Sequence, residues 1–142
     1  NDNVDIALEI DSDGVHVGQS DMEAGDVRAK LGADKIIGVS AQTVEQALRA
    51  QEHGADYLGV GAMYATNTKT DARAVTKEQL VEIRAAVDIP IVIIGGVNQK
   101  TVPNFKGMGI DGAAVVSAVV SQPDIEKAAK DLRELCEDCF GR

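Results

Sequence analysis

Short apolar runs rich in β-branched residues recur along the chain, and each precedes a segment with helix-like spacing. The runs are Val15-His16-Val17, Ile36 to Val39, Tyr57 to Val60, Ile91 to Ile94 and Ala113 to Val116. Continuous apolar runs that alternate with helices are typical of a parallel sheet covered on both faces. The pattern therefore predicts an α/β protein with parallel strands.

The expected helices carry signals at their ends. Thr43 with Gln46 and Thr76 with Gln79 both fit the capping box, in which a hydroxyl and an amide satisfy unpaired backbone N–H groups. Glycines that end helices are expected at Gly54 and Gly107. Core faces are predicted by apolar spacing of three to four residues at Val44, Ala47, Leu48 and Gln51, at Leu80, Ile83 and Val87, and at Ile125, Ala128, Ala129 and Leu132.

Groups suited to an anion follow the last three of these strands. Thr66 to Lys69 supplies two hydroxyls and an ammonium, Gly95-Gly96 lets backbone N–H groups approach an oxyanion, and Ser117 adds a hydroxyl. Each could instead be an ordinary turn or loop. Three in successive units favour a site for a phosphorylated ligand, at the loops where α/β proteins keep their sites.

Two architectures fit this order of elements. The chain length favours a five-strand flavodoxin-like sheet, because a (β/α)8 barrel needs eight strands and typically more than about 200 residues. The placement of Gly95-Gly96 and Ser117 favours a TIM-type barrel, whose phosphate site follows its last two strands. Gly59-Val60-Gly61 does not continue into a dinucleotide-binding motif, since Tyr64 stands where the third glycine belongs.

Composition narrows the class of protein. With 142 residues, 44% of them hydrophobic, the chain is expected to form a single domain over residues 1–142. A net charge of −9 and the absence of Trp make nucleic acid an unsuitable partner. No apolar stretch is long enough for a membrane helix and the first residues are acidic, so no membrane partner and a cytoplasmic location are expected.

Cys136 and Cys139 form a C-x-x-C pair near the end of the chain. A zinc site needs four ligands, and neither His16 nor His53 completes a second pair at the required spacing. The cysteines are expected to lie on one face of a terminal helix, with metal or redox use as the alternative.

Six motifs occur in the order found in thiamine phosphate synthase, which the chain resembles from Asn1 to about Leu135. They are Asn1-Asp2, Gly14 to Asp21, Ile37 to Ser40, Thr66 to Lys69 with Asp71-Ala72, Ile94 to Val97, and Val115 to Ala118. That family is a (β/α)8 barrel that joins hydroxymethylpyrimidine diphosphate to a thiazole phosphate and releases diphosphate with the help of Mg²⁺. The resemblance implies this transferase activity, in thiamine biosynthesis.

The resemblance starts within the family's barrel. In the family, Asn-Asp closes the third strand, and an earlier strand carries a Gln-x-Arg-x-Lys motif that binds the diphosphate. The chain thus resembles the C-terminal two-thirds of a synthase. By itself it is expected to be inactive, and to self-associate or pair with the N-terminal barrel segment, because a cut barrel has open sheet edges.

The resemblance also implies roles for individual residues. Lys69 would act on the leaving diphosphate and Ser40 beside the pyrimidine, and these two are the expected catalytic residues. Asp2 and Asp21 would hold Mg²⁺, and Asn1 would contact the pyrimidine diphosphate. The residues expected around the thiazole phosphate are Thr66, Thr68, Gly96, Val116 and Ser117.

Structural explanations remain open for several of these residues. Asp21 suits a helix N-cap, Ser40 could help to start the helix that follows it, and His16 is expected to pack within its strand rather than to act in catalysis. Two other functions also remain: a relative that isomerises a thiazole phosphate, and a non-catalytic module that binds a phosphorylated ligand.

Overall fold

The protein contains one parallel sheet of five strands, in a computed structural model that describes residues 1–64 and 74–141. The strands are β1 (Gly14–Val17), β2 (Ile36–Ala41), β3 (Tyr57–Val60), β4 (Ile91–Ile93) and β5 (Gly112–Ala113). All five predicted strands are therefore present. The last is shorter than predicted, because the chain bends after Ala113 and Val116 becomes the N-cap of a helix.

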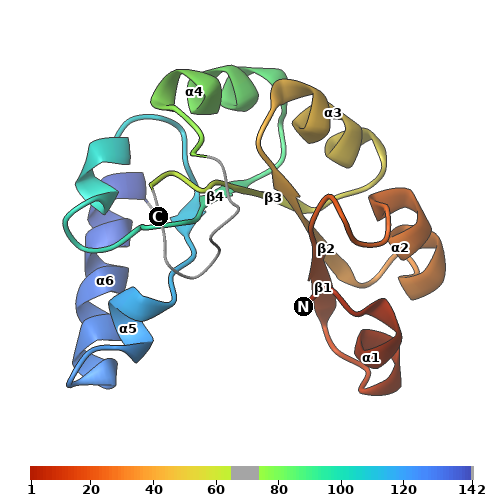
Figure 1. Cartoon of the computed structure of the whole chain (residues 1–142), viewed down its shortest axis with the longest axis horizontal. Helices are drawn as coiled ribbons and strands as arrows, with labels where there is room; N and C mark the ends of the chain where they lie inside the picture. Colours follow the sequence, from red (N-terminus) through yellow and green to blue (C-terminus); the bar gives the residue numbers. More distant parts are fainter. Residues whose placement is uncertain (65–73, 142) are drawn as a thin grey trace.

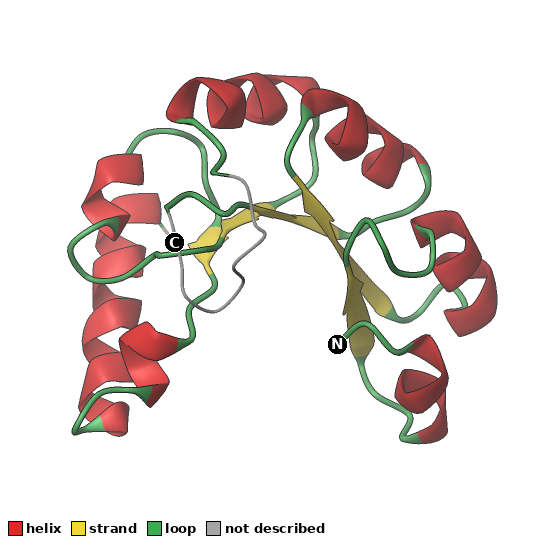
Figure 2. Ribbon diagram, in the orientation of Figure 1, coloured by secondary structure: helices red, strands yellow, loops and turns green. Residues whose placement is uncertain are grey.

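The strands lie side by side in the order in which they occur in the sequence, β1-β2-β3-β4-β5. The sheet curves into an arch, and most of the helices lie along its outer side (Figures 1 and 2). A flavodoxin-like sheet has the order 2-1-3-4-5 and helices on both faces. The flavodoxin-like alternative is therefore wrong, as is the expectation of cover on both faces, and the sheet is an arc of a (β/α) barrel.

The helices are α1 (Val4–Glu9), α2 (Ala24–Leu31), α3 (Val44–Glu52), α4 (Lys77–Ala86), the 3-10 helix η1 (Val102–Phe105), α5 (Ser117–Val120) and α6 (Ile125–Phe140). Thr76 forms the predicted capping box with Gln79. Thr43 caps α3, but the Gln46 amide oxygen accepts from the Gln42 N–H instead of closing the box. In the parts of the chain that the structure describes, no helix has the length and apolarity needed to cross a bilayer.

The core lies between the sheet and the outer helices. Successive side chains of a strand point to opposite faces, and the buried set alternates accordingly. It comprises Val15, Val17, Ile37, Val39, Leu58, Val60, Ile91 and Ile93. Burying an aliphatic side chain of this size stabilises a fold by about 1.5–3 kcal/mol. These buried residues on the helix-covered face form the apolar runs from which the sequence predicts the strands.

Three residues predicted to lie on core faces are exposed instead. The buried residues of α3 are Ala47 and Ala50, and Leu48 is 44% exposed. Adjacent residues of an α-helix are separated by about 100°, so Leu48 turns away from the sheet when Ala47 faces it. In α6 the buried face runs through Ala128, Leu132 and Cys139, which leaves Ile125 and Ala129 exposed.

The cysteines lie on α6, as predicted. Cys139 is buried, Cys136 is half-buried, and neither forms a disulfide. Burial raises the pKa of the Cys136 thiol above its ordinary value.

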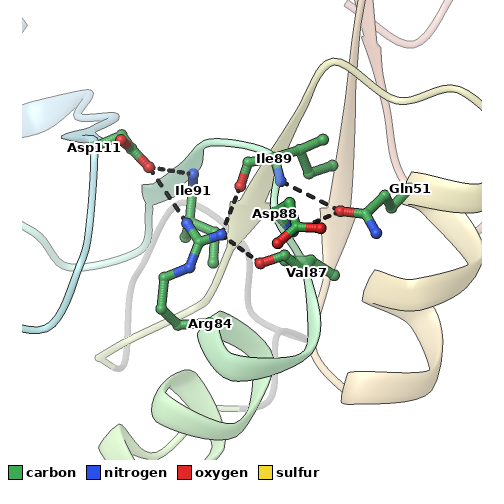
Figure 3. A network of polar contacts seen from close by, with 7 residues as sticks. All are labelled: Gln51, Arg84, Val87, Asp88, Ile89, Ile91 and Asp111. Atoms are coloured by element: carbon green, nitrogen blue, oxygen red, sulfur yellow. Dashed lines mark hydrogen bonds and ion pairs between the residues drawn. The ribbon is translucent and has the colours of Figure 1, made fainter.

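Polar networks hold the amino ends of the strands. The Arg84 guanidinium of α4 donates to the carbonyl oxygens of Val87 (2.6 Å) and Ile89 (3.0 Å) and lies 3.5 Å from Asp111 Oδ2 (Figure 3). Asp111 Oδ2 also accepts from the Ile91 N–H at 2.9 Å. These contacts anchor the α4–β4 connection to the start of β5, on the end of the sheet opposite to the site described next.

Candidate active site

A cavity of about 1160 Å³ lies at the carboxyl ends of the strands. The segments after β1, β2, β3, β4 and β5 all contribute to its wall. Every predicted site residue that the structure describes lines it: Asn1, Asp2, Asp21, Ser40, Gly96, Val116 and Ser117. Thr66, Thr68 and Lys69 lie outside the described residues. Segments far apart in the sequence thus bring their polar groups to one hollow, the usual place of the site in such barrels.

One end of the cavity is acidic. Asp2 and Asp21 line both this cavity and an adjoining hollow of about 390 Å³. The Asp2 N–H donates to the His16 carbonyl oxygen at 2.8 Å, which ties the start of the chain to β1. Asp21 Oδ2 accepts from the Gly18 N–H at 2.7 Å and shapes the turn after β1. Asp21 is not a helix N-cap, because Glu23 caps α2.

The donor set at this end suits a hard divalent cation. Among the described residues, no group of three or more His, Cys, Asp or Glu side chains is placed to hold a metal ion. Two carboxylates are nevertheless what Mg²⁺ commonly takes from a protein, with water and substrate phosphate oxygens filling its other positions. The chemistry of Asp2 and Asp21 would therefore suit a magnesium ion that also binds phosphate oxygens.

A chain of hydrogen bonds crosses the inner face of the sheet. His16 of β1 has its Nε2 at 2.9 Å from Ser40 Oγ of β2 and its Nδ1 at 2.9 Å from Tyr57 Oη of β3. The Ser40 carbonyl oxygen accepts from Gln19 Nε2 at 2.7 Å. Burial raises the pKa of the Tyr57 phenol above its ordinary value. Ser40 does not start a helix, because Thr43 caps α3.

His16 is thus more than a packing residue, because it lines the cavity and connects two hydroxyls. Alternation could have revealed this, since a histidine between buried Val15 and Val17 must face the other side of the sheet. The sequence pattern predicts Tyr57 only as part of a strand, whereas the register of β1, β2 and β3 places it level with His16 across Gly38.

Two glycines make room for this chain. A Cβ atom on Gly38 would lie 2.1 Å from Tyr57 Cζ and 2.5 Å from His16 Nδ1. A Cβ atom on Gly59 would lie 3.0 Å from His16 Cε1. Any larger residue at Gly38 would therefore displace one of the two rings. The two glycines thus provide the space that the side chains of His16 and Tyr57 occupy on the inner face.

The other end of the cavity is built from the loops after β4 and β5. Gly95 and Gly96 have positive φ angles of 88° and 67°, which favour glycine. A Cβ atom on Gly95 would also lie 2.4 Å from that of Ala62. Lys100, which the sequence did not single out, is the only lysine or arginine among the described residues of the wall. Backbone N–H groups, a hydroxyl and an ammonium suit an anion here.

Comparison with known proteins agrees with this geometry. Residues 1–119 match the family model described as thiamine monophosphate synthase. A thiamine-phosphate synthase of Clostridium beijerinckii is 57% identical over 133 residues, covering 94% of this chain and 64% of the relative. The corresponding protein of Clostridium botulinum is 54% identical over 134 residues, covering 94% of this chain and 63% of the relative. The chain thus spans just under two thirds of these relatives.

Solved structures show the same arc. A thiamine phosphate pyrophosphorylase from Pyrococcus furiosus superposes with a TM-score of 0.89 at 41% identity, covering 99% of this chain and 67% of that one. A 3-hexulose-6-phosphate synthase superposes with a TM-score of 0.70 at 24% identity, covering 93% of this chain and 66% of that one. The second likeness concerns the fold alone.

Proposed function

Because the chain belongs to the thiamine monophosphate synthase family, we propose that it forms the larger part of an enzyme that joins hydroxymethylpyrimidine diphosphate to a thiazole phosphate. The observation that carries this proposal is the division of one cavity into two ends. Asp2 and Asp21 lie at one end, Gly96 and Ser117 lie at the other, and the strand order sets Ser40 of β2 between them. A reaction between a diphosphate and a monophosphate needs two such anion sites.

At the acidic end we assign the pyrimidine diphosphate. Asp2 and Asp21 would hold Mg²⁺, which supplies positive charge to the diphosphate when bound. Asn1 would contact the same substrate, and Ser40 would lie beside its pyrimidine ring. The hydrogen bond from the Gly18 N–H holds the Asp21 carboxylate at the cavity wall. The same bond would therefore position both the loop after β1 and the metal ion that Asp21 would bind.

At the opposite end we assign the thiazole phosphate. Gly96, Val116 and Ser117 would surround its phosphate, together with Thr66 and Thr68 from the loop after β3. Lys69 would stabilise the departing diphosphate as a point charge. In the reaction, the C–O bond to diphosphate breaks, the diphosphate leaves with the electron pair, and the thiazole nitrogen forms the new C–N bond. Catalysis would rest on positioning and electrostatics.

The two carboxylates favour the synthase over the alternatives. An isomerase of a thiazole phosphate shares the phosphate loops but has no diphosphate to neutralise. A simple binding module needs only one anion site. Asp2 and Asp21 facing the same cavity as Ser117 are therefore better explained by two phosphorylated substrates.

The sheet has two outer strands, β1 and β5, in the described part of the chain, as expected of a barrel arc. The apolar side chains of Val120 in α5 and Ile125 at the start of α6, which follow β5 in the sequence, are both more than half exposed. We name these two residues the β5-edge surface. We propose that this surface is covered either by the N-terminal segment of the barrel or by a second copy of the chain.

The direct test joins the chain to a matching N-terminal segment. The N-terminal third of the Clostridium beijerinckii relative, fused ahead of Asn1, should give a protein that forms thiamine phosphate from the two substrates in the presence of Mg²⁺. The 142-residue chain alone should form none. A fused, folded protein that binds neither substrate would contradict the proposal, and full activity of the chain alone would contradict the need for the N-terminal segment.

A further inference from the structure

We propose that Tyr57 is a positioning residue that fixes the tautomer of His16, so that Ser40 turns its hydroxyl proton towards the cavity. Three strands contribute one residue each. His16 lies between Ser40 Oγ at its Nε2 and Tyr57 Oη at its Nδ1, both at 2.9 Å. The tautomer does not depend on the proposed reaction, whereas the ligand assigned to Ser40 below rests on the proposed function.

With Ser40 and Tyr57 as hydrogen-bond partners, a neutral His16 ring allows two arrangements of protons. A neutral imidazole has one N–H donor and one acceptor nitrogen. If Nδ1 carries the hydrogen, His16 donates to Tyr57 and the Ser40 hydroxyl must donate to Nε2. If Nε2 carries the hydrogen, Tyr57 donates to Nδ1 and Ser40 accepts. Only the second arrangement leaves the Ser40 proton available to a ligand.

The relative acidity of the two hydroxyls selects the second arrangement. A phenol, with an ordinary pKa near 10, is a better hydrogen-bond donor than an aliphatic hydroxyl, whose oxygen is the better acceptor. His16 offers one acceptor nitrogen, so the phenol should take it. Burial raises the pKa of Tyr57, which keeps its proton in place. Within the described residues, His16 is the side chain with which the Tyr57 hydroxyl forms a hydrogen bond.

The surrounding backbone holds the rings in this relationship. Tyr57 passes over Gly38, whose missing side chain leaves the path to His16 open. The two rings are tilted by 40° with their centroids 5.5 Å apart, so they meet at their polar atoms rather than by stacking. On the other side, the Ser40 carbonyl oxygen is engaged by Gln19 at 2.7 Å. Ser40 is thus oriented from both sides before any ligand arrives.

As a consequence, the Ser40 hydroxyl in the cavity wall would act as a hydrogen-bond donor towards a ligand. Ser40 would donate to an acceptor atom, such as an unprotonated ring nitrogen of a pyrimidine. With the opposite tautomer Ser40 would present only lone pairs and would suit an amino group instead. Tyr57, which lies behind His16, would therefore select which edge of a heterocycle binds at Ser40.

The tautomer can be read directly from the ring nitrogens. The chain contains two histidines, so His16→Asn assigns the signals of His16 by their disappearance from the nitrogen-15 NMR spectrum of labelled protein at mildly alkaline pH. The unsubstituted chain should show His16 with hydrogen on Nε2. Tyr57→Phe should move it towards the Nδ1–H form. The matched control is Tyr64→Phe, because Tyr64 accepts from Asn104 and packs on Phe105; it should leave the His16 signals unchanged.

Two results would overturn the proposal: hydrogen on Nδ1 in the unsubstituted chain, or no change of tautomer in folded Tyr57→Phe. If Tyr57→Phe fails to fold, the His16 tautomer measured in the unsubstituted chain is by itself the test of the proposal. In the fused enzyme, Tyr57→Phe should raise KM for the pyrimidine diphosphate by about tenfold, the scale of one lost hydrogen bond, with little change for the thiazole phosphate. A fused enzyme without synthase activity but with the Nε2–H tautomer would refute the proposed function and keep the role of Tyr57.

Discussion

Asp56 and Asp111 occupy equivalent places in two strand–helix units. Asp56 lies just before β3 and accepts a hydrogen bond from a backbone N–H of β2, and Asp111 lies just before β5 and accepts one from a backbone N–H of β4. Asp56 Oδ2 accepts from Ile37 at 2.8 Å, and Asp111 Oδ2 accepts from Ile91 at 2.9 Å. Each also contacts an arginine from the helix ahead of that strand, Arg28 at 2.6 Å for Asp56 and Arg84 at 3.5 Å for Asp111. The repeated device fixes the register of neighbouring parallel strands.

We expect Asp111→Ala to lower the free energy of unfolding by about 2 kcal/mol, because it leaves the largely buried Arg84 guanidinium and the Ile91 N–H without this acceptor. Urea unfolding measures the change. The control is Asp138→Ala, whose pair with Lys106 is exposed and should contribute less than about 0.5 kcal/mol. Equal losses in the two variants would show that the Asp111 contacts do not stabilise the fold.

Gly38→Ala should destabilise the protein by about 1–3 kcal/mol, since the new Cβ atom would force Tyr57 or His16 to move. Gly112→Ala is the matched control, because among the described residues its Cβ atom would meet Val92 alone, at an ordinary 3.8 Å. That variant should stay within about 0.5 kcal/mol of the unsubstituted chain. Denaturant unfolding compares them, and a Gly38→Ala variant as stable as Gly112→Ala would contradict the crowding inferred here.

The two ends of the cavity should respond separately in the fused enzyme. Ser117→Ala should weaken thiazole phosphate binding by about 1–3 kcal/mol, the scale of a hydrogen bond to a charged group, and leave the Mg²⁺ dependence unchanged. Asp21→Asn should weaken the response to Mg²⁺ and spare the thiazole phosphate. Titration calorimetry measures both ligands. If both variants lose the Mg²⁺ response equally, the assignment of separate sites is wrong.

Acid should remove a contribution made by Glu23. The hydrogen bond from His53 is the main cause that holds the pKa of Glu23 below its ordinary value of 4.5. A carboxyl group with a lower pKa in the folded state stabilises the fold above its unfolded pKa, and this contribution is lost as the pH falls through the folded pKa. Glu23→Gln should therefore make stability less dependent on pH below about 4.5.

The measurement for Glu23 is a series of urea midpoints from neutral to acidic pH. His53→Asn removes the main cause of the lowered pKa and should reproduce the flatter acid limb. An acid limb of unchanged slope in Glu23→Gln would refute the contribution of this carboxylate.

The chain alone should self-associate through the β5-edge surface. Val120→Lys places a charge on that surface and should reduce association in sedimentation velocity. Val81→Lys is the control, because Val81 is also exposed but lies on the outer helix α4. A chain that sediments as a monomer, or an equal effect of both substitutions, would argue against this surface.

The sequence predicted the strands because one face of each is apolar, as at Ile37 and Val39. It wrongly predicted helices over the other face as well, because a glycine such as Gly38 is equally compatible with a face under a helix and with an open interior. The strand order, which settles the architecture, depends on pairing between distant segments and leaves no local signal. Leu48 was misplaced because small alanines form the buried face of α3.

The site could be predicted only in part. Seven residues named from the family resemblance do converge on the cavity, although their roles stay predictions. Tyr57 was missed because a tyrosine in a strand is ordinary, and its contact with His16 follows from the register of three strands. Lys100 was missed because it comes several residues after the glycine pair and reaches the wall through the fold of its loop.

The sequential strand order has a consequence for how the protein is made. Each described strand from β2 to β5 pairs with the one before it in the sequence, so no pairing within this arc requires a distant segment. Each pairing therefore closes only a short loop and has a small entropy cost, so the arc can form one strand–helix unit at a time during synthesis. The described cavity wall includes the end of each of these strands, so this part of the site cannot form before the last unit has docked.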